Sequence, residues 1–298
     1  MTETDTVGNA ILITGAARTG TSLIGQVIHS CQGVEYAYEP AGLLSLYAKM
    51  PDFLARPQLV ALWKSLYAGY LFRDFLMPTL AGRRLNFREG DESYIHYCKS
   101  VSEIGGRLMS SGRDLDVYPR ALQSTLAYKL PDILPFLGQF HHFYPKTRLV
   151  VLLRNPGDTI ASLVQKGWFS DATLAQAWAN WPSREEGVPF WVPLGEESSW
   201  RDAREVGRAV LYFTWQYLAL MTDLRPNDLI LVDYDYLVED PPHEIMPLLQ
   251  RLGLNPGPKT EGLIQAIRPR AQPKAEDPIM APAWQTYREL KGWLPSRV

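Results

Sequence analysis

Cysteine and histidine are scarce in this chain of 298 residues, which contains two cysteines, Cys31 and Cys98, and five histidines. Two cysteines cannot build a disulfide framework, and no Cys or His cluster has the spacing of zinc ligands. The sequence therefore predicts a reduced protein without a bound metal, as is typical of the cytoplasm.

The chain also lacks an excess of charge of one sign and any long hydrophobic run. Lys and Arg number 30 against 32 Asp and Glu, the formal net charge is −2, and no basic block stands out. Nothing therefore indicates nucleic-acid binding. The longest apolar runs, such as 149–153, are far shorter than the ~20 residues of a membrane helix, and the polar amino terminus does not resemble a signal peptide. We expect a cytoplasmic protein without a membrane span.

Short apolar runs alternate with helical patterns along much of the chain. Residues 10–14, 148–153 and 229–233 are rich in aliphatic residues, as buried parallel strands are, and residues 34–38 (VEYAY) also favour a strand. Helical spacing or a helix-initiating proline follows the first, third and fourth of these segments in chain order. The sequence therefore predicts an α/β fold, with a P-loop-like parallel β-sheet flanked by helices, in a single domain over 1–298.

Three stretches depart from this alternation. Residues 41–145 carry helical patterning broken by prolines and no convincing strand, which predicts a helical insertion. Residues 167–205 are rich in Trp, Pro and Gly and predict an irregular, aromatic-rich insertion. Residues 255–298 predict a C-terminal loop and helix. We expect the insertions to form the part of any active site that binds the acceptor substrate, because loops and inserts carry specificity on shared folds.

A glycine-rich turn, residues 15–22 (GAARTGTS), follows the first expected strand. Its G-x-x-x-x-G spacing is that of a Walker A loop, in which backbone N–H groups and a helix N-terminus bind phosphate. The Walker lysine is missing, because Thr21 stands in its place, and Arg18 lies inside the loop. This change favours a ligand with a shorter phosphate chain than ATP. A plain strand-to-helix turn would explain the glycines, but not Arg18 with its neighbouring hydroxyl residues.

A second candidate anion site, residues 154–162 (RNPGDTIAS), follows the third expected strand. Helix capping alone accounts for Asn155 at the N-cap and Pro156 at the first helical position. It does not account for Arg154 or Ser162. An Arg at the end of a buried strand and a hydroxyl on the next helix can grip a phosphate from two sides.

In this order, the two motifs resemble the cofactor signatures of sulfotransferases that use 3′-phosphoadenosine 5′-phosphosulfate (PAPS). The turn is similar to the family's 5′-phosphosulfate loop, and 154–162 is similar to its 3′-phosphate motif. Residues 128–131 (YKLP) resemble the K-x-P segment of the tyrosylprotein and bacterial branches. Residues 232–254 resemble the family's late V-x-Y-E-x-L…D-P…L-G-L segment, with Asp235 replacing the usual Glu. Order and spacing make this resemblance specific, and it does not extend to the insertions.

Two departures indicate a branch of the family. The cytosolic branch has Lys where this chain has Arg18, and its catalytic His has no counterpart here. The resemblance therefore favours the bacterial and tyrosylprotein-like branch, which has an Arg in the loop and a Glu base about 21 residues beyond it. Glu39 stands 21 residues after Arg18.

The resemblance implies a role for each matching residue. Glu39 would accept the proton of an acceptor hydroxyl, Arg18 would neutralise the departing phosphate, and Lys129 would contact the sulfuryl oxygens. No metal is implied. The implied cofactor-binding residues are Ala17, Arg18, Thr19, Gly20, Thr21 and Ser22 at the 5′-phosphate, Arg154 and Ser162 at the 3′-phosphate, and Lys166 and Tyr234 at the nucleotide.

Structural roles compete with several of these assignments. Glu39 could cap the helix after Pro40, Lys129 could be a solvated surface lysine, and Tyr234 could be a core residue. His141 and His142 have no ligand-like spacing. Three C-terminal basic residues could close over the cofactor or form a solvated cluster: Arg268, Arg270 and Lys274. Three tryptophans could stack on a sugar, although an aromatic core is the commoner fate: Trp181, Trp191 and Trp200.

The sequence thus favours a PAPS-dependent sulfotransferase acting on a hydroxyl, or an amine, of a small molecule or carbohydrate. One alternative is a P-loop kinase using ATP and Mg²⁺, with Asp233 as metal ligand, which the missing lysine opposes. Another is a nucleotide-binding protein without catalytic activity. The sequence identifies neither the acceptor nor the oligomeric state.

Overall fold

The computed structural model describes residues 2–81, 99, 114–176, 181–268 and 277–294. Cys98, Arg270 and Lys274, named above, lie outside these ranges. Cys31 is buried and forms no disulfide within the described chain.

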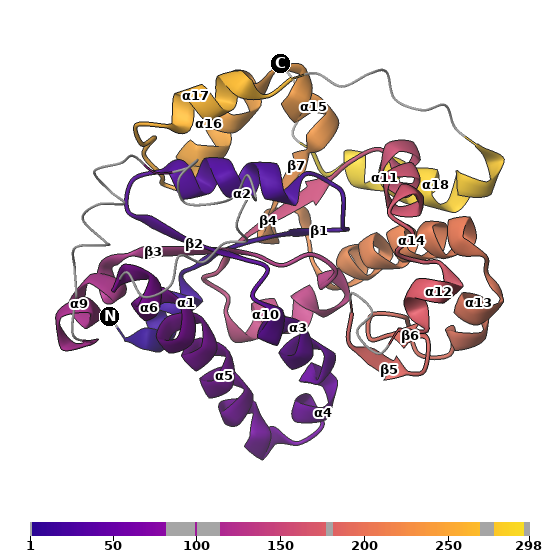
Figure 1. Ribbon diagram of the computed structural model, residues 1–298, viewed down its shortest axis with the longest axis horizontal. Helices are drawn as coiled ribbons and strands as arrows, with labels where there is room; N and C mark the ends of the chain where they lie inside the picture. The colour runs from indigo at the N-terminus through magenta and orange to yellow at the C-terminus, as the bar shows by residue number, and fades with distance from the viewer. Residues whose placement is uncertain (1, 82–98, 100–113, 177–180, 269–276, 295–298) are drawn as a thin grey trace.

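A five-stranded parallel sheet forms the centre of the molecule (Figure 1). The strand order is β2-β3-β1-β4-β7, and all four pairings are parallel. Four of the strands coincide with the apolar runs at 10–14, 34–38, 148–153 and 229–233, so these predictions are confirmed. The strands are β1 (Ile11–Gly15), β2 (Val34–Tyr38), β3 (Thr125–Lys129), β4 (Arg148–Leu153) and β7 (Ile230–Asp233).

Strand β3 corrects the expectation that residues 41–145 contain no strand. The segment TLAYK is short, begins with Thr125 and ends with Lys129, so it does not stand out as an apolar run. In the sheet it lies between β2 and β1, and Ala127 pairs with Tyr36 on one side and Ile11 on the other. Two neighbouring strands therefore stabilise a segment whose own sequence is a weak signal. As a result, Lys129 stands at the carboxyl end of an inner strand.

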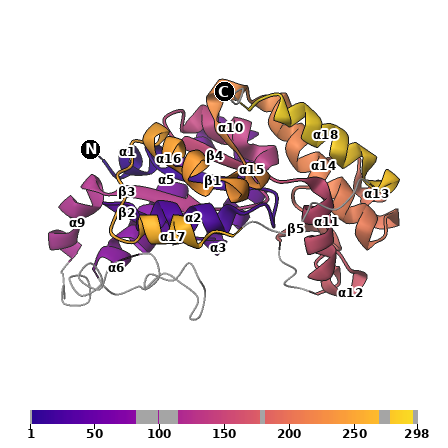
Figure 2. The same cartoon turned by 90° about the horizontal axis from the view of Figure 1, so that it is seen from above.

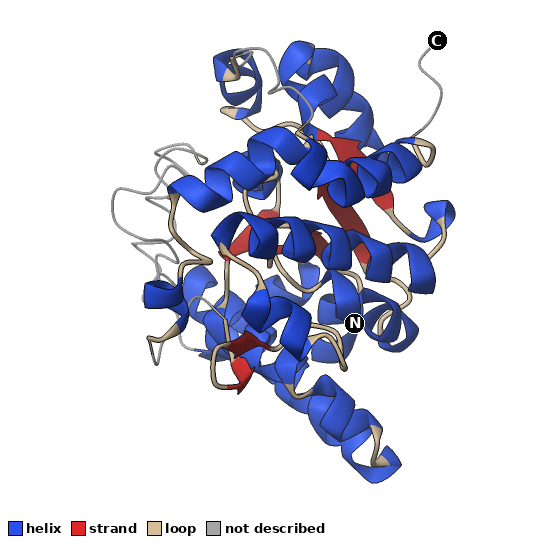
Figure 3. Ribbon diagram, turned by 90° about the vertical axis from the view of Figure 1, so that its right-hand side faces the viewer, coloured by secondary structure: helices blue, strands red, loops and turns tan. Residues whose placement is uncertain are grey.

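Helices cover both faces of this sheet, as Figures 1 and 3 show. Along β1, Ile11 and Ile13 belong to one hydrophobic cluster and Leu12 to the other, because successive strand side chains point to opposite faces. One face packs against α2 (Thr21–Ser30), α15 (Tyr234–Glu239), α16 (Pro241–Arg251) and α17 (Thr260–Ala266). The other carries α1 (Glu3–Gly8), the short turn η2 (Leu134–Phe136), α10 (Leu137–Phe143) and most of the insertions.

The first insertion is helical apart from β3. Its helices pack beneath the sheet in Figure 1, and α5 buries Trp63 and Tyr67 in the larger cluster. The described elements are α3 (Ala41–Ala48), α4 (Met50–Leu54), α5 (Pro57–Leu71), a π-helical turn η1 (Phe72–Leu76), α6 (Met77–Leu80) and α9 (Asp114–Gln123).

The second insertion follows α11 (Pro156–Gln165) and leads into the long helix α14 (Glu205–Asp223). Its described elements are short: α12 (Asp171–Leu174), β5 (Ser183–Glu185), β6 (Val188–Pro189) and α13 (Glu197–Asp202). Trp191 and Trp200 are fully buried there, with ring centroids 5.1 Å apart.

The C-terminal part contains more helix than a loop and one final helix. Helix α17 forms within it, followed by a 3₁₀ turn η4 (Pro278–Met280) and α18 (Ala281–Lys291). Figure 2 shows α18 lying along α14 at the side of the sheet where α11 also lies. The last helix is thereby placed next to the carboxyl ends of β4 and β7.

Candidate active site

A cleft of about 720 Å³ opens at the carboxyl ends of the strands. Ligands of open parallel sheets bind at this edge, because the loops that leave the strands converge there. The residues lining it come from both motifs and from the ends of β2, β3 and β7. They include ten of the twelve predicted site residues: Ala17, Arg18, Gly20, Thr21, Ser22, Glu39, Lys129, Arg154, Lys166 and Tyr234.

The glycine-rich turn between β1 and α2 has the backbone of an anion-binding loop. Gly15, Arg18 and Gly20 all have positive φ, at 148°, 71° and 96°. Gly20 packs against the ring of Tyr234, so a Cβ at this position would overlap it. Gly20 is also the N-cap of α2 and supplies no side-chain cap, so the N–H groups of the first turn remain available to an anion.

The turn is held from behind by buried groups. The Thr19 hydroxyl donates to the Ala16 carbonyl oxygen at 2.7 Å, and Thr19 is fully buried, so its side chain serves the turn itself. The Ala17 N–H donates to the Tyr212 hydroxyl at 2.5 Å and to Asp132 Oδ1 at 3.2 Å. The Ala16 N–H donates to the Tyr217 hydroxyl at 3.3 Å. The turn is thus fixed in shape before any ligand binds.

The second motif interlocks with this turn. Asn155 caps α11, as predicted, because its Oδ1 accepts from the Asp158 N–H at 2.9 Å. Arg154 is 5% exposed; its Nη1 donates to the Arg18 carbonyl oxygen at 3.1 Å and its Nη2 pairs with Asp158 at 3.2 Å. The Arg18 Nε donates to Ser162 Oγ at 3.0 Å. The described contacts of Arg18 therefore join it to this second motif.

Arg154 retains a donor for a ligand. Its Nε is buried and has no hydrogen-bond partner among the described residues, and its guanidinium carbon lies 5.0 Å from the centre of the Tyr234 ring. A buried donor without a partner is rare in a folded protein. Tyr234 is itself 7% exposed, so it is both a buried side chain and a wall of the cleft.

Glu39 and Lys129 form an ion pair across the ends of β2 and β3. Lys129 Nζ lies 2.6 Å from Glu39 Oε1 and donates to Ser22 Oγ at 2.7 Å. It also lies 4.3 Å from the centre of the Tyr38 ring. Lys129 is 3% exposed and is therefore not a solvated surface lysine. Glu39 does not cap α3, since Pro40 is the N-cap and no side-chain cap is present.

Three residues of this region escaped the sequence analysis. Asp132 directly follows the YKLP segment, and its carboxylate accepts hydrogen bonds from the Ala17 N–H, the Tyr212 hydroxyl and Trp181 Nε1. Its position one residue after Pro131 is a signal that could have singled it out. Tyr212 and Tyr217 lie on α14, about 200 residues from the turn, and no local pattern marks them.

Asp233, the metal ligand of the kinase alternative, has a different environment. Its Oδ1 accepts from the backbone N–H groups of Asp235 and Tyr236 and so caps α15. Its Oδ2 accepts from Lys291 Nζ at 2.8 Å. Asp233 is 2% exposed and is not among the residues that line the cleft. Nothing in this arrangement favours magnesium binding.

The remaining candidates divide between core and surface. Trp191 and Trp200 are buried in the aromatic cluster, whereas Trp181 both packs in it and lines the cleft. His141 and His142 lie in the last turn of α10. Arg268 is exposed, and its Nη1 donates to the Gln265 carbonyl oxygen at 2.5 Å.

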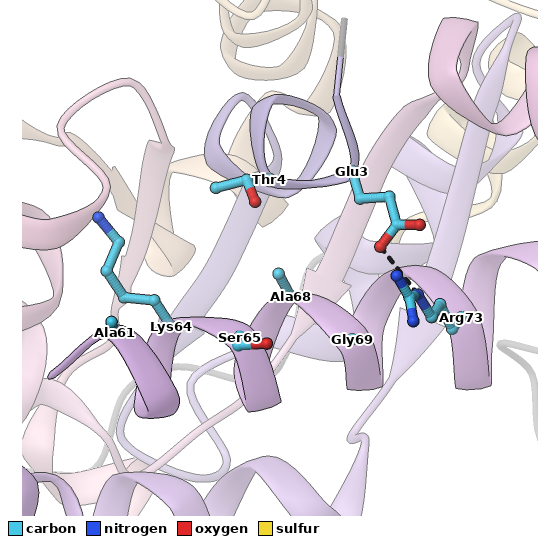
Figure 4. A pocket seen from close by; sticks show the side chains of 8 residues that line it. All are labelled: Glu3, Thr4, Ala61, Lys64, Ser65, Ala68, Gly69 and Arg73. Atoms are coloured by element: carbon cyan, nitrogen blue, oxygen red, sulfur yellow. Dashed lines mark hydrogen bonds and ion pairs between the residues drawn. The ribbon is translucent and has the colours of Figure 1, made fainter. Parts of the chain in front are cut away.

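A second, smaller hollow of about 320 Å³ lies between α1 and α5 (Figure 4). Its lining includes Glu3 and Arg73, which form an ion pair at 2.9 Å, and Lys64. It contains none of the predicted site residues, so the larger cleft is the candidate active site.

The family model of the sulfotransferase family matches residues 10–256, and the chain therefore belongs to that family. No curated protein sequence matches it. Similar solved structures include the sulfotransferase domain of the Synechococcus PCC 7002 olefin synthase, with 14% identity, 96% of each chain covered and a TM-score of 0.48. Others are the sulfotransferase from Alicyclobacillus acidocaldarius (16%, 95% of this chain and 97% of that chain, 0.43) and sulfotransferase STF1 from Mycobacterium tuberculosis H37Rv (15%, 97% and 78%, 0.44).

None of the helices in the described part of the chain is both long and apolar enough to cross a membrane. The described residues also bring together no group of three or more His, Cys, Asp or Glu side chains that could hold a metal ion.

Proposed function

We propose that this protein transfers the sulfuryl group of PAPS to a hydroxyl, or an amine, of a small-molecule or carbohydrate acceptor. The observation that carries the proposal is the meeting of the lysine-free turn, Arg154 and the Glu39–Lys129 pair in one cleft. The cleft offers four cationic side chains, and its two carboxylates already accept hydrogen bonds or pair with Lys129. These cationic side chains fit a ligand with two separated phosphate groups.

The donor would be held at both ends. The first-turn N–H groups of α2, with Thr21 and Ser22, would bind the 5′-phosphate, and the Thr19 side chain would support the turn from within. Arg154, through its unpartnered Nε, and Ser162 would bind the 3′-phosphate. Tyr234 and Lys166 would contact the nucleotide.

The chemistry would fall to three side chains. PAPS supplies an activated sulfuryl group, so the protein mainly positions the reactants and neutralises developing charge, by analogy with phosphoryl transfer. Glu39 would accept the proton of the acceptor hydroxyl. Lys129, 2.6 Å from that carboxylate, would face the sulfuryl oxygens. Arg18 would leave Ser162 to neutralise the oxygen on the departing phosphate.

Ligand binding tests the donor assignment. We expect adenosine 3′,5′-bisphosphate, the product of PAPS, to raise Tm, and Arg154→Ala to abolish the rise. A ligand at 100 times its Kd adds about 2.7 kcal/mol, which corresponds to several degrees at roughly 2–4 °C per kcal/mol. Arg73→Ala, at a surface ion pair outside the residues that line the cleft, serves as the control. Stabilisation by ATP with Mg²⁺ in place of the bisphosphate would instead favour a kinase.

Transfer of labelled sulfate from PAPS to a panel of sugars, phenols and other alcohols tests the reaction itself. Transfer to at least one acceptor, lost in Glu39→Ala, is the expected result. Binding of the bisphosphate without transfer to any acceptor would indicate a nucleotide-binding protein that lacks catalysis.

A further inference from the structure

Asp132 is attached to the glycine-rich turn through both its backbone and its side chain. It follows Pro131, three residues beyond the end of β3, and has a left-handed backbone with φ of 69°. Its N–H donates to the Gly15 carbonyl oxygen at 3.2 Å, and its Oδ1 accepts from the Ala17 N–H at 3.2 Å. One residue therefore holds two positions of the turn.

The same carboxylate also holds a second segment that lines the cleft. Its Oδ2 accepts from Trp181 Nε1 at 2.6 Å, and its Oδ1 accepts from the Tyr212 hydroxyl. Trp181 belongs to the second insertion, lines the cleft and stacks on Phe169 with ring centroids 5.2 Å apart. Asp132 thus accepts hydrogen bonds from both the glycine-rich turn and Trp181 of the second insertion.

A carboxylate is an expensive group to place here, since Asp132 is 5% exposed and forms no ion pair among the described residues. Burial raises its pKa to about 6, although the hydrogen bonds from Tyr212 and Trp181 oppose this. An asparagine would avoid the buried charge, but it has one acceptor oxygen and an NH₂ group. Three N–H and O–H donors converge on the two oxygens, so only a carboxylate satisfies all of them.

We propose, resting on the function proposed above, that Asp132 is a positioning residue that aligns the phosphosulfate-binding turn with the acceptor wall at Trp181. Sulfuryl transfer needs the acceptor oxygen in line with the bond that breaks, and the two reactants are bound by different segments. A single buried carboxylate fixes the separation of those segments. Small displacements of reacting groups cost as much as about 10²-fold in rate.

The test is a double-mutant cycle between Asp132→Asn and Trp181→Phe. Asp132→Asn turns an NH₂ group toward one of three donors, so we expect kcat to fall about 10–100-fold and KM for PAPS to rise several-fold. Trp181→Phe removes the Nε1 donor, which lets the asparagine NH₂ occupy that side while its oxygen still accepts from Ala17. In the double variant, KM for PAPS is therefore expected to recover toward the value of Trp181→Phe alone.

Trp191→Phe is the matched control, because Trp191 is buried in the same aromatic cluster but its Nε1 has no partner among the described residues. Trp191→Phe should not restore KM for PAPS when it is combined with Asp132→Asn. Equal behaviour of the two phenylalanine variants, or additive effects throughout, would overturn the proposal and leave Asp132 a simple packing residue.

Amide hydrogen exchange separates this inference from the proposed function. Faster exchange at Ala17 in Asp132→Asn and in Trp181→Phe, but not in Trp191→Phe, is expected whether or not the wild type transfers sulfate. Unchanged exchange would contradict the link itself. If Asp132→Asn does not fold, the exchange rate of the Ala17 amide in Trp181→Phe, compared with that in Trp191→Phe, still tests the link. A wild-type protein that neither binds the bisphosphate nor transfers sulfate would contradict the proposed function. It would not contradict the connection that Asp132 makes between the turn and Trp181.

Discussion

Glu39, the proposed general base, is partly exposed at the cleft, whereas its ion-pair partner Lys129 is buried. We predict that Glu39→Gln lowers kcat by about 10²–10⁴-fold, the usual contribution of a positioned base, and changes KM for PAPS little. Steady-state kinetics with a fixed acceptor measures both. Glu185→Gln, at an exposed ion pair with Arg201, is the control and should keep its activity. A Glu39→Gln variant with wild-type kcat would assign the proton transfer elsewhere.

At the scale of single residues, motifs in the sequence identify the site residues that they contain. They do not identify the supporting residues that distant segments contribute. The resemblance to the sulfotransferase family singles out Glu39 and Lys129, and the structure brings them within 2.6 Å of each other. Their catalytic roles stay predictions. Asp132 and Tyr212 support the turn through contacts 115 and 195 residues apart in the chain. Such contacts depend on how β3 and α14 pack, which local periodicity does not reveal.

At the scale of elements, α18 is fastened to the sheet by a buried charge. Lys291 Nζ donates to Asp233, and Tyr287 donates to Asp235, which in turn accepts from the Asn155 backbone and side chain. Burial is the largest single influence on Lys291 and lowers its pKa, but the hydrogen bonds and charges of Asp233 and Tyr236 together raise the Lys291 pKa. The last helix is therefore linked to the second motif through acidic side chains.

Removing this link should destabilise the fold. We predict that Lys291→Met lowers the free energy of unfolding by about 2–3 kcal/mol, because it leaves the Asp233 carboxylate buried without its cation. The loss stays below the 3–5 kcal/mol of a fully buried pair, since a quarter of the Lys291 side chain remains exposed. Urea unfolding measures it. Arg251→Met removes the same charge from an exposed site in the last turn of α16, and an equal loss in both variants would show that Asp233 is not the reason.

Prediction of whole elements succeeded for the continuously apolar strands β1 and β4 and failed for β3. Strands β1 and β4 are five- and six-residue segments with buried aliphatic residues on both faces, which matches their place inside a parallel sheet. Strand β3 begins with Thr and ends with the buried Lys129, whose ammonium group pairs with Glu39 and donates to Ser22, both from other segments. Its identity as a strand depends on partners that the local sequence does not name.

At the scale of the whole molecule, a net charge of −2 coexists with a cleft that gathers four cationic side chains. Two of them, Lys129 and Arg154, are nearly buried, whereas Arg18 and Lys166 are exposed. The Debye length falls from about 30 Å at 0.01 M salt to about 10 Å at 0.1 M, and salt screens exposed charges far more than buried ones. We therefore expect Arg18 and Lys166 to attract an anionic ligand from a distance, and Lys129 and Arg154 to hold it once it is bound.

This division predicts how salt affects donor binding. Raising ionic strength from 0.01 to 0.1 M should slow association of adenosine 3′,5′-bisphosphate about tenfold and change its dissociation rate less than about twofold, because steering acts on encounter. Stopped-flow measurement separates the two rates. Lys166→Ala should flatten the salt dependence of association, whereas Arg154→Ala should speed dissociation at every salt concentration. A salt effect carried by dissociation would mean that the exposed cations contact the bound nucleotide more closely than the buried ones do.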